Sequence, residues 1–329
     1  MDFNLDETQG ELRDLARDVL SRDDDAGSWK AFAQAGLLGA ALPEEAGGAG
    51  LGAVEMAVLL RETGQRVTAM PALACLVAGQ VIGRYGTAAQ KAALAPVAEG
   101  SEIVTFGWRD VGAPTREEGG RLTGRKTMVP YASQASRILV SADTGLFLVD
   151  VEATAVQEMP FSTGEPGAVV TLDGTPGERV DGPAVALGEH ATAGITATAS
   201  GVLAGALALT TDYIKTRKQF GRALAEFQAV TVQIADVYIA ARALDVAMWS
   251  AVWRLAEGLP AAEDLALAAY NMTDGALKAL YTCQHLHGGI GLDVTYPLHR
   301  YFAWGSHAAH QLGGVEAQLD QIGALCSSN

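Results

Sequence analysis

The composition of the 329-residue chain is that of a folded, acidic protein. Hydrophobic residues make up 49% and charged residues 19%, which excludes a disordered or low-complexity chain. Its 23 Lys and Arg against 38 Asp and Glu give a formal net charge of −15, so nucleic-acid binding through a basic surface is excluded. A small phosphorylated ligand remains compatible, because local arginines and helix N-termini act at short range.

The cysteines and the N-terminal residues indicate the cellular compartment of the chain. Cys75, Cys283 and Cys326 are far apart and form no CxxC pair, which is typical of reduced thiols rather than of disulfides or a zinc site. The acidic start MDFNLDETQ predicts no secretory or transit peptide. Thr, Asp and Lys interrupt the apolar stretch at 199–214, so we expect no membrane span. These features predict a soluble cytoplasmic protein with no metal and no membrane partner.

The first region of the chain has helical periodicity. From Leu5 to about Ala98, apolar residues recur at spacings of three and four. Pro43 and the glycines of 47–50 predict a loop, after which the helical spacing resumes at Val54.

The remaining chain changes period twice. At 102–186, short apolar runs alternate with Gly, Asp and Pro turns, which predicts an antiparallel barrel or sandwich. From 189 the spacing is helical again, and apolar positions across 226–258 predict one long helix in a bundle. The predicted divisions are an N-terminal helical domain at 1–99, a central β-barrel domain at 100–186 and a C-terminal helical bundle at 187–329.

One motif with chemical potential lies between two of the predicted long helices. It reads Thr216-Arg217-Lys218-Gln219-Phe220-Gly221 and is followed by Phe227-Gln228. Arginine suits a pyrophosphate because its planar fork makes paired hydrogen bonds to phosphate oxygens, and phenylalanine offers a face to an adenine or flavin ring. The same residues also suit a basic helix C-terminus that Gly221 caps. Both interpretations stay open at this point.

A second motif reads His285-Leu286-His287-Gly288-Gly289-Ile290-Gly291. Adjacent glycines let the backbone approach a ligand and present N–H groups to phosphate. The motif does not follow a strand, so it is not a Rossmann fingerprint, and an ordinary helix-ending glycine turn is the alternative. His285 and His287 would point to different faces of a helix without a third ligand nearby, so we expect no metal site.

Taken together, the motifs resemble those of the acyl-CoA dehydrogenase family, and the resemblance covers essentially the whole chain. Trp29 to Gly39 is similar to the family's W..L...GLLG, and the chain continues into a segment similar to VPEEYGGLG. The matching segments are, in chain order, Trp29-Lys30-Ala31-Phe32, Ala35-Gly36-Leu37-Leu38-Gly39, Leu42-Pro43-Glu44-Glu45, Gly47-Gly48-Ala49-Gly50, Arg217-Lys218-Gln219-Phe220-Gly221 with Gln228 eleven residues after Arg217, and His287-Gly288-Gly289-Ile290-Gly291.

The resemblance implies a fold, a cofactor and a shared site. The fold is α+β and mostly α, with an N-terminal helical domain, a central antiparallel β-barrel and a C-terminal four-helix bundle. FAD lies between two subunits: the barrel of one holds the flavin ring and the bundle of the other holds the dinucleotide end. His285 stands where the family has a glutamine, with Gln284 one place earlier. The implied FAD residues are Arg217, Gln219, Phe220, Gln228, His285, Gly288 and Gly289.

The resemblance breaks at the catalytic base. In the family, a glutamate abstracts the α-proton of a CoA thioester, most often near the C-terminus. Counting from the glycine pair puts Leu312 or Gly313 at that place, and neither is a base. Some members carry the glutamate earlier, near Ala191 here, which leaves Glu189 as a weak candidate. A first-turn acid favoured by the helix dipole is the alternative for Glu189. Glu316 is a weaker candidate still.

The barrel half of the FAD site also departs from the family. The segment 108–113 replaces TEP..GS, and the segment 124–130 replaces G.K.WIT. Met128 and Pro130 occupy the Trp and hydroxyl positions, and Pro130 has no N–H to donate to a flavin.

These losses predict a subunit that depends on a partner. The leading hypothesis is a short FAD-dependent acyl-CoA dehydrogenase subunit that completes the FAD site of a full-length subunit in an α2β2 assembly, as in actinobacterial steroid side-chain enzymes. The resemblance implies an acyl-CoA substrate, with a bulky ring-bearing acyl group by analogy, and an electron-transfer flavoprotein or similar acceptor. The alternatives are a self-sufficient homo-oligomer using Glu189, a flavin-free structural or regulatory paralogue, and a related flavin oxygenase or oxidase.

Overall fold

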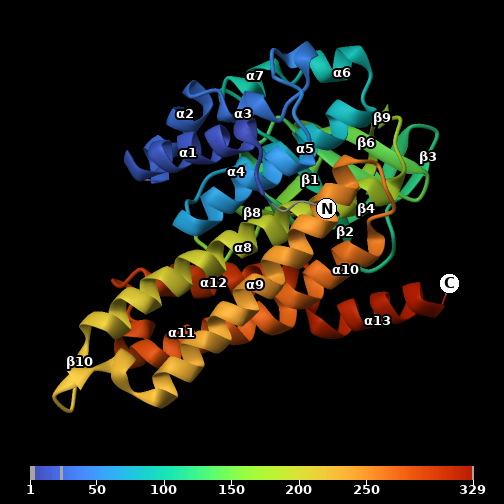
Figure 1. The fold of residues 1–329 in the computed structure, drawn as a ribbon. Helices are drawn as coiled ribbons and strands as arrows, with labels where there is room; N and C mark the ends of the chain where they lie inside the picture. The colour runs from blue at the N-terminus through green and yellow to red at the C-terminus, as the bar shows by residue number, and fades with distance from the viewer. Residues whose placement is uncertain (1–3, 23–24, 328–329) are drawn as a thin grey trace. The chain divides into compact units, whose positions relative to one another are not determined.

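The computed structural model describes residues 4–22 and 25–327, whose helices and strands are drawn in Figure 1. The chain forms two compact units. Among the described residues, the bundle unit contains Asn4, Leu60–Val67 and 195–327, and the sheet unit contains 5–22, 25–59 and 68–194. Two helices, α4 and α8, contribute residues to both units. The three-domain division along the chain therefore stays a prediction.

The N-terminal region is helical, as its periodicity predicts. Apolar residues of these helices form a buried core that includes Phe32, Leu38, Leu59 and Leu76. The predicted loop at 47–50 is present, and a side chain on Gly48 would lie 2.3 Å from the Leu42 carbonyl oxygen, so only glycine fits there. The helices are α1 (Glu7–Arg22), α2 (Asp25–Gln34), α3 (Leu37–Ala40), η1 (Glu44–Ala46), α4 (Ala53–Arg66), α5 (Ala72–Tyr85), α6 (Ala88–Ala92) and α7 (Ala95–Ala98).

The strand region forms two sheets, so the closed antiparallel barrel that the family resemblance implies is wrong, whereas the periodicity left a barrel or a sandwich open. One sheet has the strand order β1-β5-β6-β9 and the other β2-β4-β8-β7, with β3 paired to β4. The β1–β5 pair is parallel, because the chain crosses over through β2, β3, β4 and η2 and enters β5 in the same direction as β1. The elements are β1 (Val104–Gly107), β2 (Arg109–Asp110), β3 (Arg116–Glu118), β4 (Arg121–Pro130), η2 (Ala132–Gln134), β5 (Arg137–Ala142), β6 (Gly145–Asp150), η3 (Val151–Ala153), β7 (Ala155–Glu158), β8 (Gly167–Pro176) and β9 (Glu178–Val180).

The core of the strand region consists of residues from both sheets. Leu122 and Val129 of β4, Val140 of β5 and Val170 of β8 belong to one buried cluster. A register shift interrupts the β4–β8 ladder between Lys126 and Val129, where the strand bends.

The C-terminal region is a bundle of long helices, as predicted. The predicted helix across 226–258 is α9, which runs from Gln228 to Ala256. A π-helical segment, η5, joins α10 to α11. The elements are α8 (Ala184–Thr216), β10 (Lys218–Gln219), β11 (Arg222–Ala223), η4 (Leu224–Glu226), α9 (Gln228–Ala256), α10 (Ala262–Tyr270), η5 (Asn271–Ala276), α11 (Leu277–His287), η6 (Gly288–Leu292), α12 (Leu298–Gln311) and α13 (Gly314–Ser327).

Small residues bring α4 and α8 into backbone contact within the bundle unit. A side chain on Gly64 would lie 2.0 Å from the Thr198 carbonyl oxygen. Next to this crossing, the Arg61 guanidinium contacts the Asp245 carboxylate at 3.2 Å, which also accepts a hydrogen bond from Ser200. This crossing explains why the second half of α4 belongs to the bundle unit.

Helix α8 corrects the expectation that no segment could cross a membrane. It is long and apolar enough by length and composition, with a mean hydropathy of 1.5 over its most apolar window. Of that window, 72% is buried inside the structure, which is the burial of a core helix.

The three cysteines differ in accessibility. Cys75 and Cys283 are buried, and burial raises the pKa of the Cys75 thiol to about 12 and that of Cys283 to about 11. Cys326 is exposed on α13. All three are free thiols, as their spacing predicts.

Candidate functional site

The arginine motif forms a two-strand hairpin at the end of α8. The helix ends at Thr216, and Lys218–Gln219 pairs with Arg222–Ala223 in antiparallel register. The two turn residues, Phe220 and Gly221, have φ angles of 51° and 80°, the conformation of a type I′ turn. Gly221 therefore belongs to the hairpin turn and does not cap the helix, which corrects the alternative interpretation of the motif.

The hairpin presents an aromatic side chain at its tip. Phe220 is 94% exposed, which is unusual for a large apolar side chain. Its ring meets the Phe227 ring edge-on at 6.4 Å, and the Arg222 guanidinium lies 3.9 Å above the Phe227 ring. These contacts leave the Phe220 face open to a planar ligand.

The hairpin also carries an uncompensated positive charge. Within the described part of the chain, the exposed Arg217 side chain has no ion-pair partner, although the chain as a whole is strongly acidic. Gln219 and Gln228 are exposed beside it, and Gln228 is the first residue of α9. An unpaired guanidinium flanked by amides suits a phosphate group.

The glycine motif ends α11 and leads into η6. Gly288 has a φ of 62°, and side chains built on Gly288 and Gly289 would meet no atom within 4 Å. Both glycines are exposed, so their backbone faces open space. His285 is exposed on the last turn of α11.

The structure brings the two motifs together, although about 70 positions separate them. Tyr213, one turn before Arg217 on α8, stacks on the His287 ring with centroids 4.3 Å apart and donates a hydrogen bond to the His287 carbonyl at 3.3 Å. The hairpin, the glycine turn and the start of α9 thus lie at one end of the bundle (Figure 1). Sequence reasoning missed Tyr213; its place one helical turn before the arginine was the available signal.

The predicted position of the catalytic base contains no acid. Leu312 is buried at the end of α12, and its amide bonds the Ala308 carbonyl at 3.0 Å. Gly313 follows with a φ of 89°. Glu316 lies exposed in the first turn of α13.

Glu189 is half-buried in the sheet unit, on the first part of α8. Burial raises the pKa of its carboxyl above the ordinary value. The charge of the Arg84 guanidinium acts in the opposite direction and lowers this pKa by a smaller amount. A raised carboxyl pKa suits a general base, but it also arises wherever an acid is partly desolvated. The candidate role of Glu189 stays a prediction.

Strand β4 carries Met128 and Pro130, the two residues that the resemblance puts at flavin-holding positions. Met128 has a φ of 54°, and the carbonyl of Pro130 accepts a hydrogen bond from Thr105. The Lys126 side chain is fully buried and pairs with Asp110 at 2.7 Å, so this cation is already neutralised. Neither Met128 nor Pro130 has a side-chain hydroxyl, and Pro130 has no backbone N–H.

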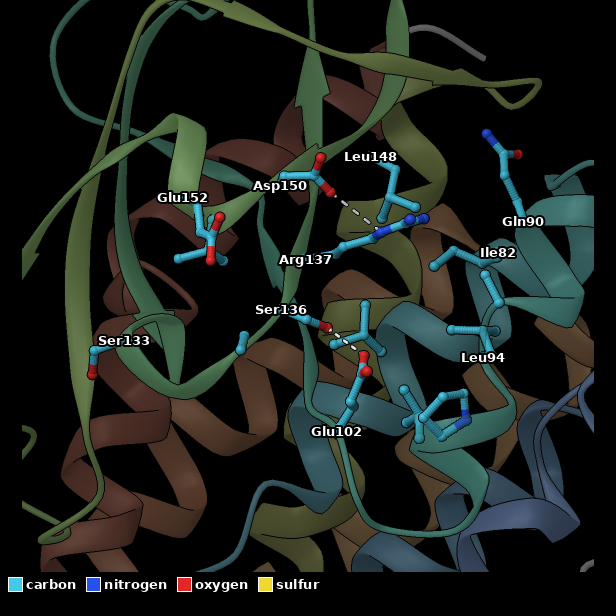
Figure 2. A pocket seen from close by; sticks show the side chains of 16 residues that line it. Ile82, Gln90, Leu94, Glu102, Ser133, Ser136, Arg137, Leu148, Asp150 and Glu152 are labelled. Carbon is cyan, nitrogen blue, oxygen red and sulfur yellow. Dashed lines mark hydrogen bonds and ion pairs between the residues drawn. The ribbon is translucent and has the colours of Figure 1, made fainter.

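A cavity of about 630 Å³ in the sheet unit is separate from all of these residues (Figure 2). Figure 2 shows Ser136 bonded to Glu102 and Arg137 paired with Asp150 along its wall. Four of its polar lining residues therefore bind one another in pairs, and it contains none of the predicted FAD residues.

Comparison with known proteins agrees with the motifs. The model named "Acyl-CoA dehydrogenase, N-terminal domain" matches residues 6–101, and "Acyl-CoA dehydrogenase, C-terminal domain" matches residues 187–326. The chain belongs to the acyl-CoA dehydrogenase family. Membership confirms the resemblance drawn from the motifs and supports FAD as the cofactor.

Individual acyl-CoA dehydrogenases are similar over the full length. Acyl-CoA dehydrogenase FadE28 of Mycobacterium tuberculosis is 40% identical, covering 99% of each chain. The structure of the Tcur3481-Tcur3483 steroid acyl-CoA dehydrogenase (G363A variant) has a TM-score of 0.92 at 38% identity, covering 98% of each chain. The ChsE4-ChsE5 complex from Mycobacterium tuberculosis has a TM-score of 0.93 at 30% identity, covering 100% of each chain.

Proposed function

We propose that this chain is a subunit of an FAD-dependent acyl-CoA dehydrogenase that desaturates a CoA thioester and completes the FAD site of a catalytic partner. The observation that carries the proposal is that this chain has one half of the expected FAD site and lacks the other half. The arginine hairpin and the glycine turn form an open, phosphate-suited end of the bundle. The family resemblance, in contrast, puts Leu312 at the position of the base and Pro130 at the position of a flavin-holding group.

Each residue of the bundle end has a defined task in this function. When bound, FAD would supply the acceptor for the hydride that leaves the substrate's β-carbon. Arg217 would compensate the pyrophosphate charge with paired hydrogen bonds, and the exposed backbone of Gly288 and Gly289 would permit close approach. The Phe220 face packs on a ring, and the Gln228 amide supplies a neutral hydrogen-bonding group.

Helix α9 has an exposed apolar stripe on which a partner subunit could pack. Val232, Ile239 and Val246 are spaced by seven residues and are 54%, 63% and 45% exposed, so they share one face of the helix. Tyr238 beside them is 57% exposed. An apolar stripe of this kind on a bundle helix favours coverage by another chain.

The structural relatives support a heteromeric assembly. Both the ChsE4-ChsE5 complex and the Tcur3481-Tcur3483 enzyme are pairs of different subunits by name, and the latter is a steroid acyl-CoA dehydrogenase. On this basis we propose a full-length partner in an α2β2 complex, a bulky acyl-CoA such as a steroid side-chain thioester, an electron-transfer flavoprotein as acceptor, and a cytoplasmic location. The partner supplies the base that Leu312 does not.

The experiment compares the visible spectrum of this chain purified alone with that of the chain co-expressed and co-purified with a candidate full-length acyl-CoA dehydrogenase subunit from the same organism. Flavin absorbance only in the co-purified sample is expected. Stoichiometric flavin in the lone chain, bleached by an acyl-CoA, would instead favour the homo-oligomer that uses Glu189. Absence of flavin from both samples would favour the structural paralogue.

The Arg217→Ala variant tests the residue assignment. We expect it to lose most of its bound FAD in the co-purified complex while assembly is retained, because it removes the charge-assisted bonds to the pyrophosphate. Arg116→Ala, which removes an exposed cation from β3, is the matched control and is expected to retain FAD. Equal flavin content in both variants would contradict the assignment.

A further inference from the structure

His287 is buried directly beside the two exposed glycines of the turn. Its side chain is 4% exposed, whereas the residues that follow it are open to solvent. A histidine is costly to bury unless its nitrogens are hydrogen-bonded. The hydrogen-bond partners of its two ring nitrogens therefore indicate the role of His287 at this position.

Both ring nitrogens of His287 have partners on different segments. Nδ1 lies 2.8 Å from the Cys283 carbonyl oxygen, one turn earlier on α11, and Nε2 lies 3.1 Å from the Tyr296 hydroxyl. A carbonyl only accepts, so Nδ1 carries the proton and Nε2 accepts from the Tyr296 hydroxyl. Burial lowers the pKa of the ring, which favours this neutral form. The ring thus ties the end of α11 to the chain that leaves η6.

Tyr213 connects the same ring to the arginine hairpin. It stacks on His287 with an interplanar angle of 19°, and its hydroxyl bonds the His287 carbonyl at 3.3 Å. The Tyr213 carbonyl accepts a hydrogen bond of 2.8 Å from the Arg217 amide. Two hydrogen bonds, both made by Tyr213, therefore connect the Arg217 amide to the His287 carbonyl at the start of the glycine turn.

We propose that His287, held between Tyr213 and Tyr296, is a positioning residue that fixes the glycine turn in register with Arg217 for the dinucleotide end of FAD. This inference rests on the proposed FAD site and adds to it residues that do not touch the cofactor. A leucine would fill the same space, but only a ring with two polar nitrogens joins three segments at once.

The test uses the co-purified complex stripped of flavin and titrated with FAD, with bound flavin followed by fluorescence. His287→Phe keeps the stacked ring and removes both nitrogens, and Tyr296→Phe removes one hydroxyl. We expect the Kd for FAD to rise about 10- to 100-fold in His287→Phe and about 3- to 10-fold in Tyr296→Phe, as for the loss of two or one hydrogen bonds. The turnover number at saturating FAD is expected to stay unchanged in both.

Two further variants separate positioning from general stability and from the site itself. Leu280→Val shortens a buried side chain two turns earlier on α11, so it lowers the melting temperature and is expected to leave the Kd unchanged. Arg217→Ala reports on the FAD site. A raised Kd in Arg217→Ala together with wild-type values in His287→Phe and Tyr296→Phe would overturn the positioning role and leave the site intact. Wild-type values in all three would overturn the site and the inference with it.

Discussion

Gly201 on α8 lies directly against the backbone of Arg61 on α4. A side-chain carbon on Gly201 would be 1.9 Å from the Arg61 carbonyl oxygen and 2.7 Å from the Gln65 amide nitrogen. Four residues later, a side chain on Gly205 would lie 2.5 Å from the Gln65 carbonyl oxygen. The two helices therefore approach at a distance that excludes any side chain at these positions.

We predict that Gly201→Ala destabilises the bundle unit. The added methyl group has to push α4 and α8 apart, and overpacking of this kind costs about 1–3 kcal/mol or more. Gly323→Ala is the matched control, since its methyl group meets no atom within 4 Å on α13 and is expected to be neutral or stabilising by up to about 1 kcal/mol. Urea unfolding measures both, and equal stabilities would contradict the close approach.

Phe220 has an unfavourable backbone conformation and an exposed side chain. Its replacement is therefore expected to affect the stability of the chain and the retention of flavin in opposite directions. Its φ of 51° is strained for phenylalanine, so Phe220→Asn is expected to leave the lone chain as stable or to stabilise it by up to about 1 kcal/mol. Flavin retention in the co-purified complex is expected to fall, because the ring face is lost. Unchanged flavin content would show that the hairpin tip does not contact the cofactor.

Glu189→Gln tests the self-sufficient alternative. If the base comes from the partner, activity of the co-purified complex stays within a few-fold of wild type, because the raised pKa of Glu189 then reflects only its partial burial. A loss of roughly 10²–10⁴ in turnover, the usual contribution of a general base, would assign that role to Glu189. Steady-state kinetics with an acyl-CoA and an artificial electron acceptor measure the difference.

Two buried histidines predict acid sensitivity. Burial lowers the pKa of His190 and of His307 to about 4 each, below the ordinary value of 6.5. The unfolded chain binds these protons first as the pH falls, so the stability that each neutral ring contributes is complete above pH 6.5 and is lost between pH 6.5 and 4. The loss is about 2 kcal/mol per histidine by pH 5.

Unfolding free energies at pH 7.5 and pH 5 measure this effect. His307→Gln removes one of the two groups and is expected to reduce the difference between the two pH values. A difference that is the same in the variant and the wild type would exclude His307 as a source of the acid sensitivity.

Local pattern was enough to predict the elements and the motifs. The spacing of apolar residues predicts α9 within two residues at each end, since a long helix repeats its signal many times. Arg217 and the glycine pair were identified as one site through the family resemblance. Physical reasoning from the residues alone left a capped helix open at Gly221, and the structure shows a type I′ turn there, which uses a positive φ as a helix cap does.

Contacts between distant parts of the chain could not be predicted from local sequence patterns. The parallel β1–β5 pair depends on how the chain crosses over through β4, and no local pattern reports that path. The His287 contacts join residues 74 and 9 positions away, so neither tyrosine could be connected to the glycine turn by spacing. The burial of α8 likewise comes from its neighbours, since its composition alone also fits a membrane helix.

The exposed Cys326 gives each copy of this chain one readily modified thiol, because Cys75 and Cys283 are shielded inside the fold. A maleimide dye added to the native chain therefore labels α13 once. Once the labelled subunits of a purified complex are separated, the ratio of dye on this chain to flavin in the complex would count copies of this chain per cofactor, without any tag or mutation.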